Sequence, residues 1–222
     1  MAVLIISVWV VSITFLMGWE LSFSNPLVYL FILIQTHLYT GLFITAHDAM
    51  HGTVAPNNKK LNNFIGQTCT TLYALFPFSK LNTKHQQHHK FVHSNQDPDY
   101  HQGNFFVWYF NFVMQYIKWW QVVAMAVIFN ILKIWISEPN LLLFWVLPSL
   151  LSTLQLFYFG TYLPHHGEHD NQHYSKSQSK NHIWAFLSCY FFGYHYEHHD
   201  SPATPWWKLW EQKEKSIEIK NG

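Results

Sequence analysis

The sequence predicts an all-α integral membrane protein, with four transmembrane helices in two hairpins and a histidine-rich cap on one side of the membrane. Half of its 222 residues are hydrophobic and only 11% are charged, about half the charged share of a soluble globular domain. Stretches of about 20 apolar residues, enough to cross the hydrocarbon core as a helix, recur along the chain. The 16 histidines outnumber the 12 acidic residues and gather between these stretches.

The predicted membrane spans are the apolar segments that lack charge over a bilayer-crossing length. They are residues 1–19, 27–46, 119–136 and 141–163. A short polar turn joins the first to the second and the third to the fourth, so each pair forms a hairpin. Lys133 lies near the end of the third span, from where its side chain can extend to the interface. Pro148 is expected to kink the fourth span.

The N-terminal apolar segment could instead be a signal peptide. No basic residue precedes it, and Trp9 and Trp19 do not fit a small-residue cleavage site, so we expect a retained helix. The shorter apolar stretches 64–78 and 183–194 fit interfacial or re-entrant elements. No linker or repeat divides the chain, which predicts a single domain over residues 1–222.

Charge distribution predicts the orientation in the membrane. The chain has no arginine, and 12 of its 13 lysines lie in residues 47–118 or 164–222. Loops rich in lysine and arginine stay on the cytoplasmic side, so we expect both polar segments and both termini to be cytoplasmic. The membrane would be a cell inner membrane, or a thylakoid in a photosynthetic cell. A net charge of +1 without a basic run argues against nucleic-acid binding.

Histidines at helical spacing form the candidate functional site. His47 and His51 follow the second span at positions i and i+4, which share one helix face. The spacing HxxHH occurs twice, more than a hundred residues apart, and the pair His165 and His166 follows the fourth span. The two HxxHH groups are His85, His88 and His89, and His195, His198 and His199.

The number of these histidines predicts two metal ions rather than one. Eight or nine imidazoles exceed the four ligands of a tetrahedral site and suit two ions with four or five ligands each. Imidazole binds zinc, copper, iron and nickel alike, so the ligand type alone leaves the metal open. Cys69 and Cys189 lie too far apart in sequence for a CxxC site, and we expect them to be buried thiols.

Four motifs resemble those of a known family. GLFITAHDAMHGT, HQQHH followed by DPDYH, FGTYLPH and FGYHYEHHDSPATPWWKL are similar to motifs of bacterial and cyanobacterial β-carotene 4-ketolases, within the membrane fatty-acid desaturase and hydroxylase superfamily. The resemblance runs from about residue 27 to residue 210. It implies two non-haem iron ions, O₂ as co-substrate and an external source of electrons. The implied ligands are His47, His51, His85, His88, His89, His165, His195, His198 and His199.

Residues next to these histidines could assist or replace ligands. His166 stands where the family has an arginine, so either His165 or His166 could bind metal, and His93 and His101 are further candidates. Carboxylates often accept the second ring N–H of a metal-bound imidazole. The acidic residues beside the motifs are Asp48, Asp97, Asp99 and Glu197. Solvation, capping or, for Asp97-Pro98-Asp99, a turn are the alternatives.

His37 is the one histidine in the middle of a predicted span. A polar residue there is a candidate functional group, so it could line a substrate channel. The alternative is a hydrogen bond to a neighbouring helix. His169, His173 and His182 lie among polar residues and are expected at the surface.

The resemblance implies oxidation of a water-insoluble carotenoid taken from the bilayer, at C4 of its β-ionone ring, through two hydroxylations to a ketone. The chain has no GxGxxG fingerprint, so we expect a ferredoxin-like or other donor to dock on the lysine-bearing face. A fatty-acyl desaturase or hydroxylase, or a carotenoid 3-hydroxylase, could use the same centre. A metal transporter or haem-binding protein is the non-enzymatic alternative. The oligomeric state is left open.

Overall fold

The computed structural model describes residues 1–221, and the side chains of residues 1–219. Its regular structure over those residues is helical, without β-strands, which confirms the predicted all-α class. The α-helices are α1 (Ala2–Met17), α2 (Leu27–Met50), α3 (Lys59–Ala74), α4 (Phe78–Phe91), α5 (Phe105–Tyr116), α6 (Trp119–Leu132), α7 (Glu138–Leu141), α8 (Leu147–Phe157), α9 (Leu163–His165), α10 (His182–Cys189), α11 (His195–Asp200) and α12 (Leu209–Asn221). Two π-helical segments, η1 (Leu142–Val146) and η2 (Tyr158–Tyr162), and a 3₁₀ turn, η3 (Trp206–Lys208), complete the set.

Two helices of the described chain are long and apolar enough to cross a membrane. They are α2 and the continuous helix Glu138–His165, which comprises α7, η1, α8, η2 and α9. Helices α5 and α6 together would make a third span, but an 83° bend separates them. Helix α1 is apolar but has only 16 residues. The second and fourth predicted spans therefore form membrane-length helices, and the predicted total of four spans stays a prediction.

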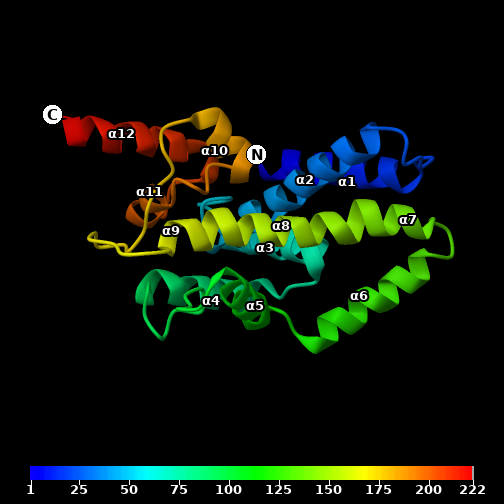
Figure 1. The fold of residues 1–222 in the computed structure, drawn as a ribbon, viewed down its shortest axis with the longest axis horizontal. Helices are drawn as coiled ribbons and strands as arrows, with labels where there is room; N and C mark the ends of the chain where they lie inside the picture. The colour runs from blue at the N-terminus through cyan, green and yellow to red at the C-terminus, as the bar shows by residue number, and fades with distance from the viewer. Residues whose placement is uncertain (222) are drawn as a thin grey trace.

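The predicted third span is shorter than expected. Helix α6 ends at Leu132, and Lys133 turns to pair with Glu138 at 2.7 Å. Of the side chains on α6 only Gln121 is buried. This helix stands away from the other long helices (Figure 1), so its apolar surface is covered by little of the protein.

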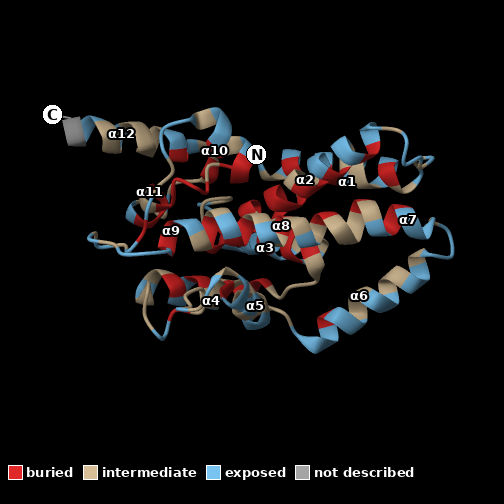
Figure 2. Cartoon of the chain, in the orientation of Figure 1, coloured by how far each residue is buried: buried red, intermediate tan, exposed pale blue. Residues whose placement is uncertain are grey.

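The long helices run side by side, with the two hairpin turns at one end of the molecule and α4, α9 and α11 at the other (Figure 1). Helix α2 is the centre of this bundle and packs against α1, α3 and α8. Its C-terminal half, largely red in Figure 2, is buried on nearly all sides and includes Tyr39, Leu42, Ile44 and Ala46. This packing fixes the position of the last turn of α2, with His47 and His51.

Polar side chains join the helices inside the bundle. Ser12 of α1 donates a hydrogen bond to Gln35 of α2 at 2.7 Å, and Thr40 donates to Ser152 of α8 at 2.9 Å. Tyr73 of α3 bonds Thr153 at 2.9 Å. Such interhelical hydrogen bonds are common where helices pack in an apolar solvent, and they tie α2 and α8 into one rigid unit.

Prolines in the last long helix coincide with its π-helical segments. Pro148 and Pro164 lack the N–H that would bond the carbonyl four residues earlier, and η1 and η2 end two residues before them. The helix continues through both positions. The kink predicted at Pro148 stays a prediction.

The shorter apolar stretches form parts of short helices, and their predicted interfacial or re-entrant placement stays a prediction. Residues 64–78 lie mostly in α3, which ends at Leu75 in the left-handed conformation (φ 59°). Residues 183–194 contain most of α10 and the turn after it. Cys69 and Cys189 are buried free thiols, as expected.

Close contact between α3 and α4 depends on Gly66. A Cβ added there would lie 2.4 Å from the ring of Phe78, which is buried beside Leu81. We expect Gly66→Ala to destabilise the protein by about 1–3 kcal/mol, despite the higher helix propensity of alanine, and thermal unfolding in detergent measures this. Gly18→Ala is the matched control, because the nearest atom to its Cβ is at 3.8 Å. Equal stability of both variants would contradict the close packing.

Candidate metal centre

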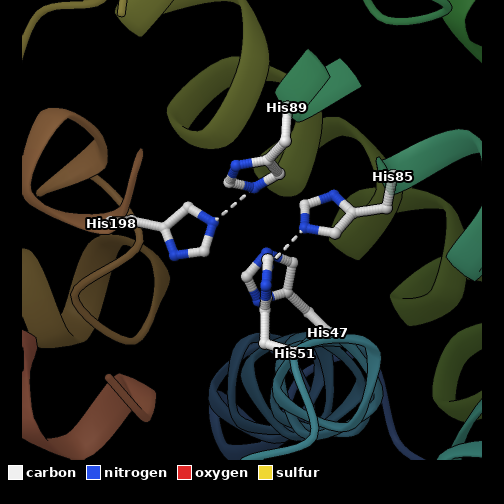
Figure 3. Close-up of side chains that lie close together, drawn as sticks. All are labelled: His47, His51, His85, His89 and His198. Carbon is white, nitrogen blue, oxygen red and sulfur yellow. Dashed lines mark hydrogen bonds between the residues drawn. The ribbon is translucent and has the colours of Figure 1, made fainter. Parts of the chain in front are cut away.

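Nine histidines from four helices and one helix cap meet at the end of the bundle opposite the hairpin turns. They are the nine that the motif resemblance implied, and they fall into two groups. Within each group, the candidate ligand atoms all lie within 4.8 Å of one another. The first cluster is His47, His51, His85, His89 and His198, and the second cluster is His88, His165, His195 and His199. Figure 3 shows the rings of the first cluster turned toward a common centre.

Helical spacing distributes the two HxxHH groups between the clusters. On α4, His85 and His89 are four residues apart and enter the first cluster, while His88 enters the second. On α11, His195 and His199 enter the second cluster and His198 the first. Residues four apart share one helix face, so each group supplies both clusters.

More ring nitrogens face one another than hydrogen bonds between them can pair. Nε2 of His195 lies 2.9 Å from Nε2 of both His165 and His199. A neutral imidazole has one N–H, so the protons cannot pair every nitrogen that faces this centre. In the first cluster, Nε2 of His51 and Nε2 of His85 are 2.6 Å apart. A shared cation would satisfy several lone pairs at once, so both donor sets fit a metal ion.

Burial keeps most of these rings neutral, which is the form that binds metal. It lowers the pKa of His85, His195 and His199 well below the ordinary value, and the neighbouring imidazoles lower it further. The pKa of His51 falls to about 4 because of burial. Lone pairs are therefore available at neutral pH in both clusters.

His88 is the exception because it has carboxylate partners. Burial lowers its pKa, but the hydrogen bond to Asp97 and the nearby charge of Asp99 outweigh that effect and raise it. His88 Nδ1 donates to Asp97 Oδ1 at 2.9 Å and lies 3.9 Å from Asp99 Oδ2. Asp97 also accepts from the backbone N–H of His93 at 3.0 Å. This bond to Asp97 holds the His88 ring with Nε2 directed to the second cluster, 3.2 Å from His199 Nε2.

Asp99 is the second carboxylate beside His88. Burial raises its pKa to about 6, and the Tyr116 hydroxyl donates a hydrogen bond to its carboxylate. Its backbone carbonyl accepts from Trp108 Nε1 at 2.7 Å. Asp97-Pro98-Asp99 is thus both a turn and a support for His88.

The other two acidic residues do not bond ligand rings. Asp48 accepts the backbone N–H of Trp206 at 3.1 Å and is 3.9 Å from Nδ1 of the adjacent His47. Glu197 points toward the C-terminal helix, where Lys213 donates to it at 3.0 Å. The predicted support of imidazoles by Asp48 and Glu197 is therefore corrected: both hold C-terminal elements against the site.

The adjacent residues His165 and His166 have different surroundings. His165 is buried in the second cluster, whereas His166 is exposed and its ring packs on Tyr162. His165 Nδ1 donates to the backbone carbonyl of Tyr174 at 2.8 Å. This carbonyl comes from a loop without a sequence signal, so sequence reasoning missed it.

The further candidate ligands, His93 and His101, lie outside both clusters. The ring of His93 packs on Tyr100, and His101 accepts the backbone N–H of Gly103 at 2.8 Å. His37 stacks on Tyr190 with 4.2 Å between ring centroids. It is not among the residues that line the cavity described below, and its buried Nε2 has no hydrogen-bond partner in the described chain.

An apolar cavity lies against the two clusters. Its wall contains His47 and His85 from the first cluster and His88 and His195 from the second. Phe192, which packs on His47 at 4.7 Å between ring centroids, also lines it. The remaining wall comes mainly from α3, α5 and α8: Tyr73, Ala74, Tyr109, Phe112, Val113, Tyr116, Ser149, Leu150, Thr153 and Leu156. A water-insoluble molecule in this cavity would contact both clusters.

These features define a class: an all-helical protein with membrane-length helices and two histidine clusters that could hold metal beside an apolar cavity. The family model described as "Fatty acid desaturase" matches residues 24–129 and 106–218. The chain therefore belongs to the fatty acid desaturase family. No solved structure matches the chain.

Relatives within that family are carotenoid ketolases. The chain is 44% identical over 182 residues to a zeaxanthin 4-ketolase of Chlamydomonas reinhardtii, covering 78% of this chain and 41% of the relative. It is 41% identical to a β-carotene ketolase of Haematococcus lacustris, covering 81% and 59%. It is 40% identical to a β-carotene ketolase of Paracoccus sp. (strain N81106 / MBIC 01143), covering 78% and 74%. The chain thus spans about half the length of the two algal relatives.

His165 and His166 provide a matched test of the second cluster. We expect His165→Ala to lower the metal bound per chain by roughly half, because a four-ligand site loses one ligand. His166→Ala should bind as much metal as the unmodified chain. Metal analysis of anaerobically purified protein measures both. Equal metal content in the two variants would show that His165 is not a ligand.

Asp97→Asn tests the support of His88. The amide keeps the shape of the side chain but removes the charge that makes the imidazole a stronger ligand, so we expect metal affinity to fall about 10-fold or more. Competition with a chelator measures the affinity. Asp170→Asn, at an exposed carboxylate, is the control and should leave it unchanged. Unaltered affinity in Asp97→Asn would contradict the assigned role.

Proposed function

We propose that this protein is a β-carotene 4-ketolase that uses two non-haem iron ions and O₂ to convert C4 of a carotenoid ring to a ketone. The observation that carries this proposal is the apolar cavity whose wall includes histidines of both clusters. The named activities of the relatives in Chlamydomonas, Haematococcus and Paracoccus support it.

The proposed iron ligands are the nine histidines of the two clusters. Iron bound there would supply the activation of O₂, with each hydroxylation at C4 taking one O₂, two electrons and two protons and releasing one water. The buried imidazoles would hold the ions as neutral ligands, and the charge of Asp97 would increase the donor strength of His88. Two hydroxylations at C4 give a geminal diol, which loses water to leave the ketone.

The cavity's own residues position the substrate. Aromatic and aliphatic side chains such as Phe43, Phe112 and Phe192 would pack against the ring of the carotenoid and exclude water from C4. Binding by apolar contact is non-directional, so the shape of the wall beside His47 and His195 must decide which ring carbon faces the metals. This fits an unactivated C–H substrate, which offers no polar group for recognition.

The proposed setting is a membrane with four spans and the metal centre on the cytoplasmic side. Both hairpin turns lie at the end opposite the histidines (Figure 1), and 12 of 13 lysines lie in the segments between or after the hairpins. The positive-inside rule then favours a cytoplasmic centre. The electrons would come from a ferredoxin-like or other external donor on that lysine-bearing side.

Pigment analysis tests the proposal. Expression of the chain in cells that accumulate β-carotene is expected to yield 4-keto products, echinenone or canthaxanthin, identified by chromatography and mass. His198→Ala, which removes a ligand of the first cluster but no apolar span, should insert normally and leave β-carotene unchanged.

Other products would redirect the assignment. Unchanged β-carotene from a folded, iron-loaded chain would overturn the ketolase proposal. A 3-hydroxylated carotenoid or an altered fatty-acid profile would indicate the hydroxylase or desaturase alternatives. A Soret band, or metal transport without pigment change, would indicate the non-enzymatic ones.

A further inference from the structure

We propose that the hydroxyl of Thr161 binds the 4-hydroxyl group of the half-oxidised ring and holds it in the cavity for the second oxidation. This inference rests on the proposed ketolase function and extends it to the residue that decides between alcohol and ketone as the released product. It starts from a cavity-lining threonine whose hydroxyl makes no hydrogen bond in the described chain.

Thr161 differs from other helical threonines of this protein. Thr36, Thr45 and Thr153 donate to the carbonyl four residues earlier at 2.8–2.9 Å, and Thr40, Thr68 and Thr83 do the same. The hydroxyl of Thr161 makes no hydrogen bond to a described residue, and the residue is only 5% exposed and lines the cavity. A hydroxyl without a partner at an apolar cavity can bond a polar group of a molecule bound there.

A local irregularity of the helix accounts for this free hydroxyl. Thr161 lies in the π-helical segment η2 (Tyr158–Tyr162), which ends two residues before Pro164. In a π turn the backbone bonds reach one residue further than in an α-helix, and such turns are frequent at functional sites. The geometry that Thr153 uses to bond its own helix is therefore altered at Thr161.

Thr161 is placed between the metal centre and the cavity. It lines the cavity together with His88 and His195 of the second cluster. It also precedes His165, another member of that cluster, by four residues in the same continuous helix. A ring carbon presented to the second cluster would therefore bring its substituent near this hydroxyl.

Most of the other hydroxyl groups in the cavity wall already form hydrogen bonds within the protein. Tyr116 donates to Asp99, Tyr73 bonds Thr153 at 2.9 Å, and Ser149 donates to the Val146 carbonyl at 2.8 Å. Tyr109 makes no hydrogen bond in the described chain, but it projects from α5, which supplies no member of either cluster. Thr161 is thus the uncommitted hydroxyl on the helix that carries a metal-site histidine.

The chemistry of the two steps gives this hydroxyl a use. The ring methylene at C4 cannot form a hydrogen bond, so Thr161 does not affect binding of the unoxidised ring. The first hydroxylation, with O₂ and an external two-electron donor, replaces one C–H by C–OH and releases water. In an apolar cavity the new hydroxyl would otherwise lack a partner and favour release. A hydrogen bond with Thr161 retains it until the second hydroxylation, which uses the same reactants.

The test compares Thr161→Val, which removes the hydroxyl and keeps the shape, with Thr161→Ser, which keeps the hydroxyl. In β-carotene-accumulating cells we expect Thr161→Val to raise the ratio of 4-hydroxylated to 4-keto carotenoid about tenfold, the effect of one neutral hydrogen bond. Thr161→Ser and the cavity-lining control Tyr109→Phe should keep the unmodified ratio. A normal ratio in Thr161→Val, or an equal rise in Tyr109→Phe, would overturn the proposal.

A binding measurement provides a readout independent of turnover. Protein stripped of metal is incubated with a 4-hydroxylated β-ring carotenoid or with β-carotene, and the retained pigment is quantified by absorbance. Thr161→Val should retain about tenfold less of the alcohol and an unchanged amount of β-carotene. Equal retention of the alcohol by both proteins would overturn the role of Thr161. If Thr161→Val proves unfolded by thermal unfolding, Thr161→Ala replaces it in both assays.

The two proposals fail in distinguishable ways. If the unmodified chain makes no ketone, the ketolase function fails. The selective retention of the alcohol then still decides whether Thr161 recognises a ring hydroxyl. If ketone forms at the normal ratio in Thr161→Val, only the Thr161 proposal fails.

Discussion

The crowding of nine imidazoles into one end of a helix bundle is the constraint on which the rest of this structure depends. Their nitrogens face one another at distances such as 2.6 Å between His51 and His85, and seven of the nine residues are buried. Burial holds most of the rings neutral, and buried polar groups without partners are costly. A cation in each cluster would satisfy these nitrogens, and metal binding would then be coupled to the stability of this end of the bundle.

The surrounding elements serve to bring short histidine segments to that end. Helix α2 is clamped along its length by α1, α3 and α8, which gives His47 and His51 a rigid base. The six-residue helix α11 could not be stable alone. It is held by the buried pair of Glu197 and Lys213, where the lysine comes from α12. Asp48 likewise holds the 3₁₀ turn at Trp206 in place, by accepting a hydrogen bond from its backbone N–H. Carboxylates beside the ligands therefore act on the scaffold as much as on the ligands.

Periodicity in the sequence was a good guide to some features and a poor guide to others. The spacing in HxxHH predicted one helix face on α4, and the structure divides that face between the clusters. Apolar length predicted α2 and the long helix ending at His165. It did not predict that α6 would end at Leu132 or meet α5 at 83°. Helix ends and bends depend on local capping and on neighbours, which an apolar count does not include.

By itself the sequence determined the helical class and the membrane-length segments, because helix periodicity and apolar length are local properties of the chain. Its motifs also identified the histidines that come together, with the choice between His165 and His166 left open. The tertiary structure decided which histidines share a cluster, that His165 rather than His166 is buried there, and that Asp97 but not Glu197 supports a ring. It also placed an apolar cavity against both clusters. These outcomes depend on how helices distant in sequence pack, and the direction of a side chain at such a contact is not encoded in its immediate neighbours.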